Sequence, residues 1–307
     1  MAASVPTAVS RRAQPWWRTQ RAQQWLVGYA FLVPDVLGLA VFIALPILGA
    51  VFISFHEWTG IGERHWNGLS NYATLMHDAA FLESLKITAI YTFTFVPLLY
   101  VIALALALLV NQGLKLTGFL RSAFFAPYMV SLVVASVIWS FMLEDPAGVI
   151  NSVIGWLGIP PQPWLGSTRL ALTSVILVTL WQSVGYSMII FLAGLQDIPA
   201  VYYEAARMDG AGAWQRFRSI TLPLLNRTSV FVLLISFISA FQLFDPIFVM
   251  TNGGPADATT TAVYYIYRQA FQFLQLGYAS ALSVALFAII LVFSLLQLRV
   301  FRDRADE

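Results

Sequence analysis

Few side chains in this sequence have the types and spacing that bond chemistry requires. The chain has no cysteine, which excludes a thiol nucleophile, a disulfide framework and a cysteine metal site. Its two lysines, Lys86 and Lys115, both follow leucine, so the Gly-Lys-Ser/Thr end of a phosphate-binding loop is absent. His56-Glu57 lacks the second histidine of a zinc-protease helix, and no Gly-x-Ser-x-Gly elbow occurs. We therefore expect neither an enzyme nor a metal site.

The composition instead fits a lipid environment. Apolar residues make up 59% of the chain, charged residues make up 10%, and the mean hydropathy is +0.75. Soluble domains are about 25% charged, so this chain cannot cover a water-facing surface. The same values exclude a disordered, fibrous or coiled-coil protein, and the net charge of +2 argues against nucleic-acid binding.

Six stretches are apolar and long enough to cross a bilayer, which takes about 20 helical residues. They are residues 36–56, 87–114, 122–143, 170–196, 228–244 and 269–298. The first extends back to about Trp25, and we interpret it as a retained span rather than a cleaved signal peptide. We predict an all-α polytopic membrane protein with six transmembrane helices.

The distribution of lysine and arginine orients these spans. Thirteen of them lie on the side that holds both termini, and four lie on the other side. Since positive charge stays in the cytoplasm, we predict cytoplasmic termini and a cytoplasmic connection 197–226. The three histidines, His56, His65 and His77, fall in the external connection 56–86, where we interpret them as exposed loop residues. The predicted parts are a basic tail (1–24), the first helix with its external loop (25–82), a core of five helices (83–301) and a tail (302–307).

The connection 197–226 has the pattern of two short helices joined by a glycine. Pro199 suits a helix start, and residues 200–209 are good helix formers. Gly210 can adopt positive φ and end that helix, after which a second helix is predicted from about 211 to 219. Trp214 and Phe217 share a face of it, and Pro223 is predicted to start the fifth span. Two interpretations stay open: an amphipathic connector in the headgroups, or an aromatic anchor for a cytosolic partner.

The spacing within this connection resembles the EAA loop of ABC-importer permeases. Glu204-Ala205-Ala206 is followed after three residues by Gly210, and after nine more by Ile220 and then Leu222-Pro223. The resemblance implies that this loop is a coupling helix, which sits in a cleft of an ATP-binding subunit and passes ATP-driven closure to the spans. The residues that it assigns to coupling are Glu204, Ala205, Ala206, Asp209, Gly210, Trp214, Phe217, Ile220, Leu222 and Pro223.

Further motifs resemble the permeases of carbohydrate importers. They include Leu45-Pro46, Gly68-Leu69-Ser70-Asn71-Tyr72, Ala126-Pro127-Tyr128 and Thr251-Asn252-Gly253-Gly254-Pro255. The likeness covers roughly residues 26–301 and is closest to the first of the two permeases, the MalF type. The maltose member of that type has extra N-terminal spans and a large external domain, and this chain has neither.

This resemblance implies an assembly in a prokaryotic inner membrane. The expected partners are a second homologous permease, two cytosolic ATP-binding subunits, an external solute-binding protein and the lipid bilayer. No cofactor is expected on this chain, because ATP and magnesium would be used by the partner ATPase. The expected function is half of an alternating-access pathway for a carbohydrate.

Polar residues within three spans are candidates for the substrate pathway, since transporter sites lie near the midplane where helices break. The candidates are Tyr128, Gln182, Tyr186, Ser236, Ser239, Gln242 and Asp245, and Gly185 is expected to interrupt the fourth span. The alternative role is packing between helices, which we favour for Ser183 and Ser236 taken singly. For Asp245, beside Pro246, a pathway role and a structural role are weighted equally.

Two other functions remain alternatives. The same architecture could import glycerol phosphate or a polyol. A different class, an autonomous secondary carrier, would need no ATPase, and neither it nor a membrane enzyme requires the spacing from Glu204 to Pro223.

Overall fold

The computed structural model describes residues 20–112 and 116–302. They fall into two compact units that divide between Phe52 and Ile53, so the predicted segment 25–82 contains this division. Residues 1–19 of the predicted N-terminal tail and residues 303–307 of the predicted C-terminal tail lie outside the described residues.

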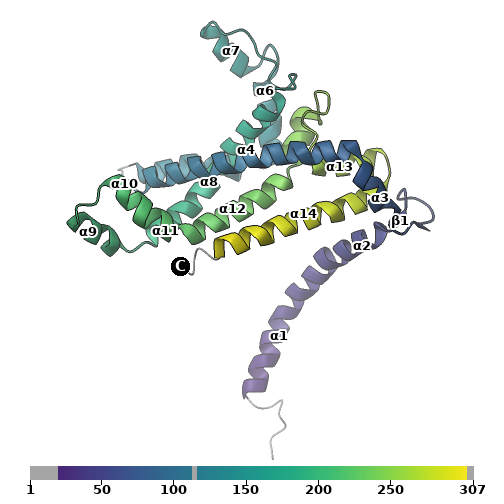
Figure 1. Ribbon diagram of the computed structural model, residues 1–307, viewed down its shortest axis with the longest axis horizontal. Helices are drawn as coiled ribbons and strands as arrows, with labels where there is room; N and C mark the ends of the chain where they lie inside the picture. Colours follow the sequence, from purple (N-terminus) through teal and green to yellow (C-terminus); the bar gives the residue numbers. More distant parts are fainter. Residues whose placement is uncertain (1–19, 113–115, 303–307) are drawn as a thin grey trace, which may run out of the picture. The chain divides into compact units, whose positions relative to one another are not determined.

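The first unit is a long apolar helix. It consists of α1 (Gln20–Leu39), the π-helical turn η2 (Ala40–Ala44) and α2 (Leu45–Ile53), drawn in purple in Figure 1. Residues Gln24–Ile53 are long and apolar enough to cross a membrane, and none of the most apolar part is buried within the chain. Such a surface belongs against lipid or against another subunit, because water would not solvate it.

The second unit contains a small hairpin of two strands and the helical core. In chain order its elements are β1 (His56–Glu57), β2 (His65–Trp66), α3 (Ser70–His77), α4 (Ala79–Val110), α5 (Thr117–Met129), α6 (Leu132–Met142), α7 (Val149–Trp156), α8 (Ala171–Gln196), α9 (Ala200–Met208), α10 (Ala213–Arg216), η3 (Phe217–Thr221), α11 (Leu222–Leu224), α12 (Asn226–Phe241), η4 (Ile247–Thr251), α13 (Ala262–Tyr267), η5 (Arg268–Gln272) and α14 (Leu276–Arg302). Across the described chain, four helices can span a membrane, or up to six if each of two bent pairs is one span. The predicted number of six therefore holds when the bent pairs are counted as spans.

Helix α4 lies at the centre of the second unit and packs against α8, α12 and α13 (Figure 1). The Tyr91 hydroxyl donates to Thr179 Oγ1 of α8 at 2.9 Å. The hydroxyls of Tyr100 and Ser229 of α12 also lie 2.9 Å apart. These buried pairs satisfy polar groups that would otherwise be costly within an apolar core.

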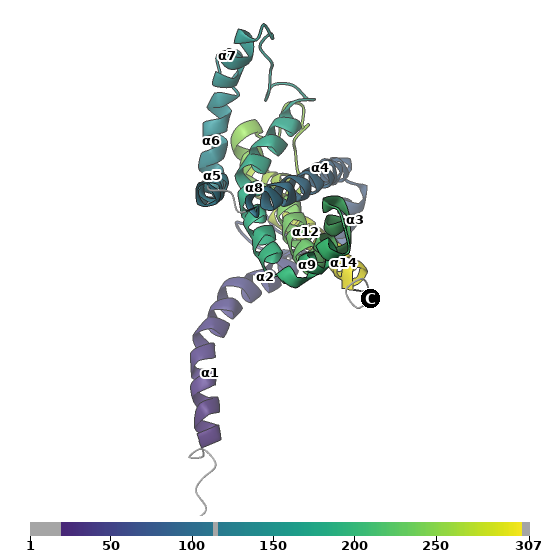
Figure 2. The same ribbon diagram turned by 90° about the vertical axis from the view of Figure 1, so that its left-hand side faces the viewer.

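Two predicted spans are bent rather than continuous. The third divides into α5 and α6, which meet at 93° (Figure 2), and the fifth divides into residues Ala213–Leu224 and α12, which meet at 66°. Pro127 lies in the last turn of α5 and has no N–H to donate, which favours ending the helix before the extended residues Val130 and Ser131. Pro223 does not start the straight part of the fifth span, because it lies in the short helix α11 before the bend, and α12 begins at Asn226.

Three further expectations are corrected by the packing. Gly185 does not interrupt the fourth span, since α8 is continuous through it. A Cβ at Gly185 would instead collide with the backbone of Phe124, so this glycine lets α5 approach α8 closely. The sixth helix begins at Leu276 rather than near Gln269. His56 is buried rather than exposed, because its strand pairs with β2 and its ring meets Trp66 edge-on at 5.0 Å.

Asp78 joins the start of α4 to α13 and α14. Its carboxylate accepts backbone hydrogen bonds from Ala80 and Phe81, as an N-cap does, and hydroxyl hydrogen bonds from Tyr265 and Tyr278 at 2.7 and 2.5 Å. Burial alone would raise the pKa of Asp78, but these four hydrogen bonds hold it below its ordinary value. The side chain is therefore an anion at neutral pH.

We expect Gly185→Ala to destabilise the protein by about 2 kcal/mol, because the added methyl group must push α5 away from α8. Gly118→Ala on α5 is the matched control, since a Cβ there would meet no atom within 4 Å. Thermal unfolding of the purified protein in detergent measures both variants. Equal melting temperatures for the two variants would contradict the close contact.

Candidate functional site

The connection 197–226 begins with α9, which ends in a glycine turn. Pro199 precedes the helix, and Gly210 adopts a φ of +79°, which confirms the predicted turn. The N–H of Gly210 donates to the carbonyl of Arg207 at 3.1 Å, and that of Ala211 donates to Ala206 at 2.8 Å. These two bonds form a Schellman cap, which needs a left-handed residue where glycine stands.

The chain after the turn is less regular than predicted. The expected second helix over 211–219 is a single α-helical turn, α10, followed by the π-helical turn η3 and by α11. Gly212 precedes α10 with a φ of −69°, which any residue can adopt. The backbone thus turns from α10 into α12 through a widened helix and a bend.

The two predicted anchor aromatics face different surroundings. Trp214 is 71% exposed, whereas Phe217 is half-buried against the core cluster of α4 and α8. Their ring centroids lie 5.5 Å apart, so Phe217 supports Trp214 from within. Trp214 is therefore the more exposed ring of the pair, and the role of both rings as an anchor stays a prediction.

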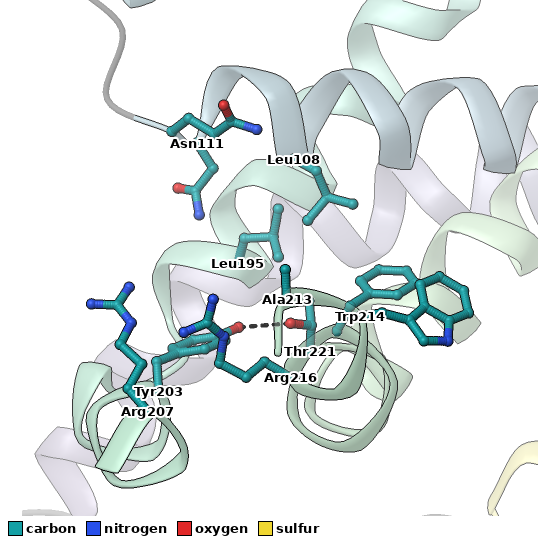
Figure 3. A pocket seen from close by; sticks show the side chains of 11 residues that line it. Leu108, Asn111, Leu195, Tyr203, Arg207, Ala213, Trp214, Arg216 and Thr221 are labelled. Atoms are coloured by element: carbon teal, nitrogen blue, oxygen red, sulfur yellow. Dashed lines mark hydrogen bonds between the residues drawn. The ribbon is translucent and has the colours of Figure 1, made fainter. Parts of the chain in front are cut away.

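A hydrogen bond that the sequence did not indicate closes the connection on itself. The hydroxyls of Tyr203 on α9 and Thr221 in η3 lie 3.0 Å apart (Figure 3). Tyr203 precedes the Glu-Ala-Ala motif, and Thr221 lies between Ile220 and Leu222. Helical periodicity relates residues within one helix only, so it could not predict a contact across the Gly210 turn. The bond fixes the angle between α9 and the segment that leads into α12.

An open cleft of about 650 Å³ lies where α9 and α10 meet the ends of α4 and α8. The side chains that line it include Leu108, Leu195, Tyr203, Arg207 and Arg216 (Figure 3). Neither arginine forms an ion pair within the described part of the chain. The cleft therefore presents uncompensated positive charge beside the Gly210 turn.

The remaining motif residues divide between surface and core. Glu204, Ala205 and Asp209 are exposed, and Ala206 is half-buried. Ile220 and Leu222 pack against the cluster that contains the buried residues of α4 and α8. Pro223 is exposed within α11. The connection thus has an outward face for contact and an inward face that touches the helical core.

Four of the predicted pathway residues line one cavity. Tyr128, Tyr186, Ser236 and Ser239 surround a space of about 140 Å³ between α4, α5, α8 and α12. The rings of Tyr128 and Tyr186 stack with centroids 4.6 Å apart. Ligand pockets usually hold about 300–1,000 Å³, so this chain by itself does not enclose a ligand of sugar size.

The other three pathway candidates lie outside this cavity. Gln182 is buried, donates to the carbonyl of Val130 at 3.4 Å and accepts from Ser183 at 3.0 Å. Gln242 is exposed at the end of α12, and Asp245 is half-buried beyond it. The structure does not bring these three to the stacked tyrosines, and their pathway roles remain predictions.

The cavity also contains hydroxyls that the sequence analysis missed or assigned to packing. Ser183, which we expected to act in packing, lines it, and so does Ser187 one turn further along α8. Their spacing of four residues could have placed them together with Tyr186 on one helix face. Phe95 and Leu99 of α4 form an apolar wall of the cavity. Because these two side chains are apolar, nothing in the sequence indicated that α4 lines the cavity.

Helical spans, a cavity between them that carries tyrosine and serine hydroxyls, and a capped surface connection are features of a transport permease. The chain belongs to the family of binding-protein-dependent transport system inner membrane components, whose model matches residues 99–305. The members of this family are transport components rather than enzymes, and the chain is a membrane-embedded component of this kind.

Individual relatives match over nearly the whole chain. The trehalose/maltose transport system permease protein MalF of Thermococcus litoralis is 36% identical, over 91% of this chain and 95% of its own. The arabinooligosaccharides transport system permease protein AraP of Bacillus subtilis is 34% identical, over 96% and 94%. The crystal structure of a bacterial ABC transporter that imports the acidic polysaccharide alginate has a similar fold, with a TM-score of 0.82 and 24% identity over 92% of this chain and 96% of that one.

We expect Tyr203→Phe to loosen α9, because Thr221 then loses its partner and a hydrogen bond contributes about 1 kcal/mol. Hydrogen exchange of the α9 amides in the purified protein should become faster by about fivefold. Tyr202→Phe is the matched control, since Tyr202 is 50% exposed and its hydroxyl makes no hydrogen bond to another described residue. Identical exchange in both variants would show that the bond does not hold the connection.

Proposed function

We propose that this chain is the transmembrane permease subunit of an ATP-driven, binding-protein-dependent sugar importer. The proposal depends on one feature of the connection 197–226. Its outer face is exposed, and its inner face packs against the core of α4 and α8. An autonomous carrier needs no such surface. The membership in a family of binding-protein-dependent transport components supports the same reading.

The proposed assembly has three kinds of component besides this chain. A second, homologous permease completes the pathway, two cytosolic ATP-binding subunits supply energy, and an external solute-binding protein delivers the substrate. This chain itself holds no cofactor, and ATP and magnesium act in the ATPase partner. The chain is a multi-pass protein of a prokaryotic inner membrane with both termini in the cytoplasm.

The proposed mechanism is mechanical rather than chemical. The ATPase contacts Trp214 and the exposed face of α9, including Glu204 and Asp209. Its closure displaces the connection as one piece, because the Gly210 turn and the Tyr203–Thr221 hydrogen bond fix its shape. Ile220 and Leu222 then pass the displacement to α4, α8 and α12, which line the cavity.

A carbohydrate is the substrate class that the cavity chemistry favours. Tyrosine rings and serine hydroxyls line it, and none of its lining residues carries a charge. Neutral sugars need such hydrogen-bonding groups beside apolar faces. Relatives named for trehalose and maltose and for arabinooligosaccharides agree with this class.

We expect cells that lack this chain to lose uptake of a carbohydrate while other solutes enter normally. The measurement is uptake of labelled mono- and oligosaccharides, polyols and glycerol phosphate, with the wild-type gene restored as the control. If only the uptake of glycerol phosphate or of a polyol were lost, that solute would be the substrate in place of a sugar. Uptake that continues after ATP depletion would indicate an autonomous carrier instead.

We expect Gly210→Pro to abolish uptake while membrane insertion stays normal, because proline cannot adopt a φ of +79° and removes the N–H that caps α9. Gly212→Ala is the control, since its φ is −69° and a Cβ would meet no atom within 4 Å. Transport and membrane abundance are measured in the same cells. Normal uptake by the proline variant would refute the coupling assignment.

A further inference from the structure

Helix α3 lies at the opposite end of the second unit from α9 and α10 (Figure 1). A second pocket is lined by residues of α3 and of the segments beside it. It has a volume of about 600 Å³, within the range of about 300–1,000 Å³ that ligand sites occupy. Its walls come from the hairpin of β1 and β2, from α3, and from the turn that leads into α14. By the predicted topology, this end of the chain faces the outside of the cell.

The walls of this external pocket are held in place by hydrogen bonds. Asn71 Nδ2 donates to the carbonyls of Ser54 and His56 at 2.8 and 3.0 Å, which fixes the hairpin onto α3. The N–H of Gly277 donates to the carbonyl of Trp58 at 3.1 Å, and a Cβ at Gly277 would collide with His56. The pocket is therefore preformed rather than a gap between loosely placed loops.

Several polar side chains in the external pocket have no hydrogen-bond partner in the described part of the chain. Asn67, Ser70, Thr74 and Gln275 line it, and their side chains make no hydrogen bond to any described residue. The indole N–H of Trp58 is buried and has no acceptor among the described residues. A buried donor without a partner is costly, which applies here to the Trp58 N–H. The side chains of Ser70, Thr74 and Gln275 are exposed in the same space, so they are free to hydrogen-bond to a ligand beside it.

The aromatic and charged groups of the external pocket narrow the class of that ligand. The ring of Phe273 is 51% exposed, and the rings of Trp58 and Tyr278 complete an aromatic wall. Among the lining residues, Glu57 alone is charged, while the Arg64 guanidinium covers Trp58 from 4.8 Å. Amides, hydroxyls and aromatic faces with little charge suit a neutral ring that carries many hydroxyls.

We propose that the external pocket is a carbohydrate-binding subsite, which holds one sugar ring of the substrate at the outer end of the permease. The inference rests on the proposed sugar import and extends it. It adds a sugar contact near the start of α4, whereas the connection 197–226 lies near the other end of that helix. Asn67, Thr74 and Gln275 bind the hydroxyls, and Phe273 packs against the ring.

The test measures sugar binding directly, on the full chain purified with the subunits that accompany it and without the external binding protein. Saturation-transfer NMR with maltotetraose, cellotetraose and arabinotetraose as probes gives the dissociation constant. Thr74→Val combined with Gln275→Leu should weaken binding of the recognised tetraose about tenfold, as expected for two lost hydrogen bonds. Ser70→Phe places an aromatic ring in the pocket and should abolish the part of the saturation-transfer signal that comes from sugar bound there.

Thr168→Val is the matched control, because Thr168 is exposed and lies outside the pocket. Equal sugar affinity in the wild type, the double variant and the control overturns the subsite. Weaker capture of the external binding protein by the double variant, with unchanged sugar affinity, also overturns it and assigns the surface to protein docking. This assay uses no uptake, so its failure leaves the importer standing, whereas normal carbohydrate uptake in cells that lack the chain refutes the importer itself.

Discussion

The packing of α4 against both α8 and α12 is the constraint on which the rest of the second unit depends. Within a bilayer no water is available to satisfy polar groups, so Tyr91 and Tyr100 must find their partners on the neighbouring helices, and they do. The two ends of α4 reach the two surfaces of the protein. Asp78 caps its start beside the external pocket, and Leu108 lines the cleft beside the coupling connection.

Under the proposed function, this arrangement explains how the connection 197–226 acts on the cavity. The Gly210 turn and the Tyr203–Thr221 hydrogen bond make the connection a rigid piece, and its inward face belongs to the same apolar cluster as α4 and α8. Close-packed interiors transmit displacement because they cannot compress. Gly185 adds to this coupling, since it lets α5 approach α8 at the height of the stacked tyrosines.

Much of the fold class and of the connection could be predicted from local sequence. Long apolar stretches indicate helices that cross a membrane, and a glycine after a run of helix formers indicates a left-handed cap. The bends at Val130–Ser131 and at Leu225 could not be placed in this way. The residues on both sides of a bend are equally apolar. Hydropathy therefore shows that a segment lies in the membrane, but it does not show where the helix axis changes direction.

The sequence by itself determined that the chain is a helical membrane protein, that one surface connection has a fixed turn at Gly210, and that bond chemistry has no residues to support it. Only the tertiary structure decided which side chains meet. It buried His56, bound Gln182 to a helix end and gathered Tyr128, Tyr186, Ser236 and Ser239 around one cavity. It also brought the side-chain amides of Asn67 and Gln275 to the external pocket. The physical reason is range: helix formation and capping depend on neighbours within a few residues, whereas tertiary packing brings together residues up to about two hundred positions apart, such as Asn67 and Gln275.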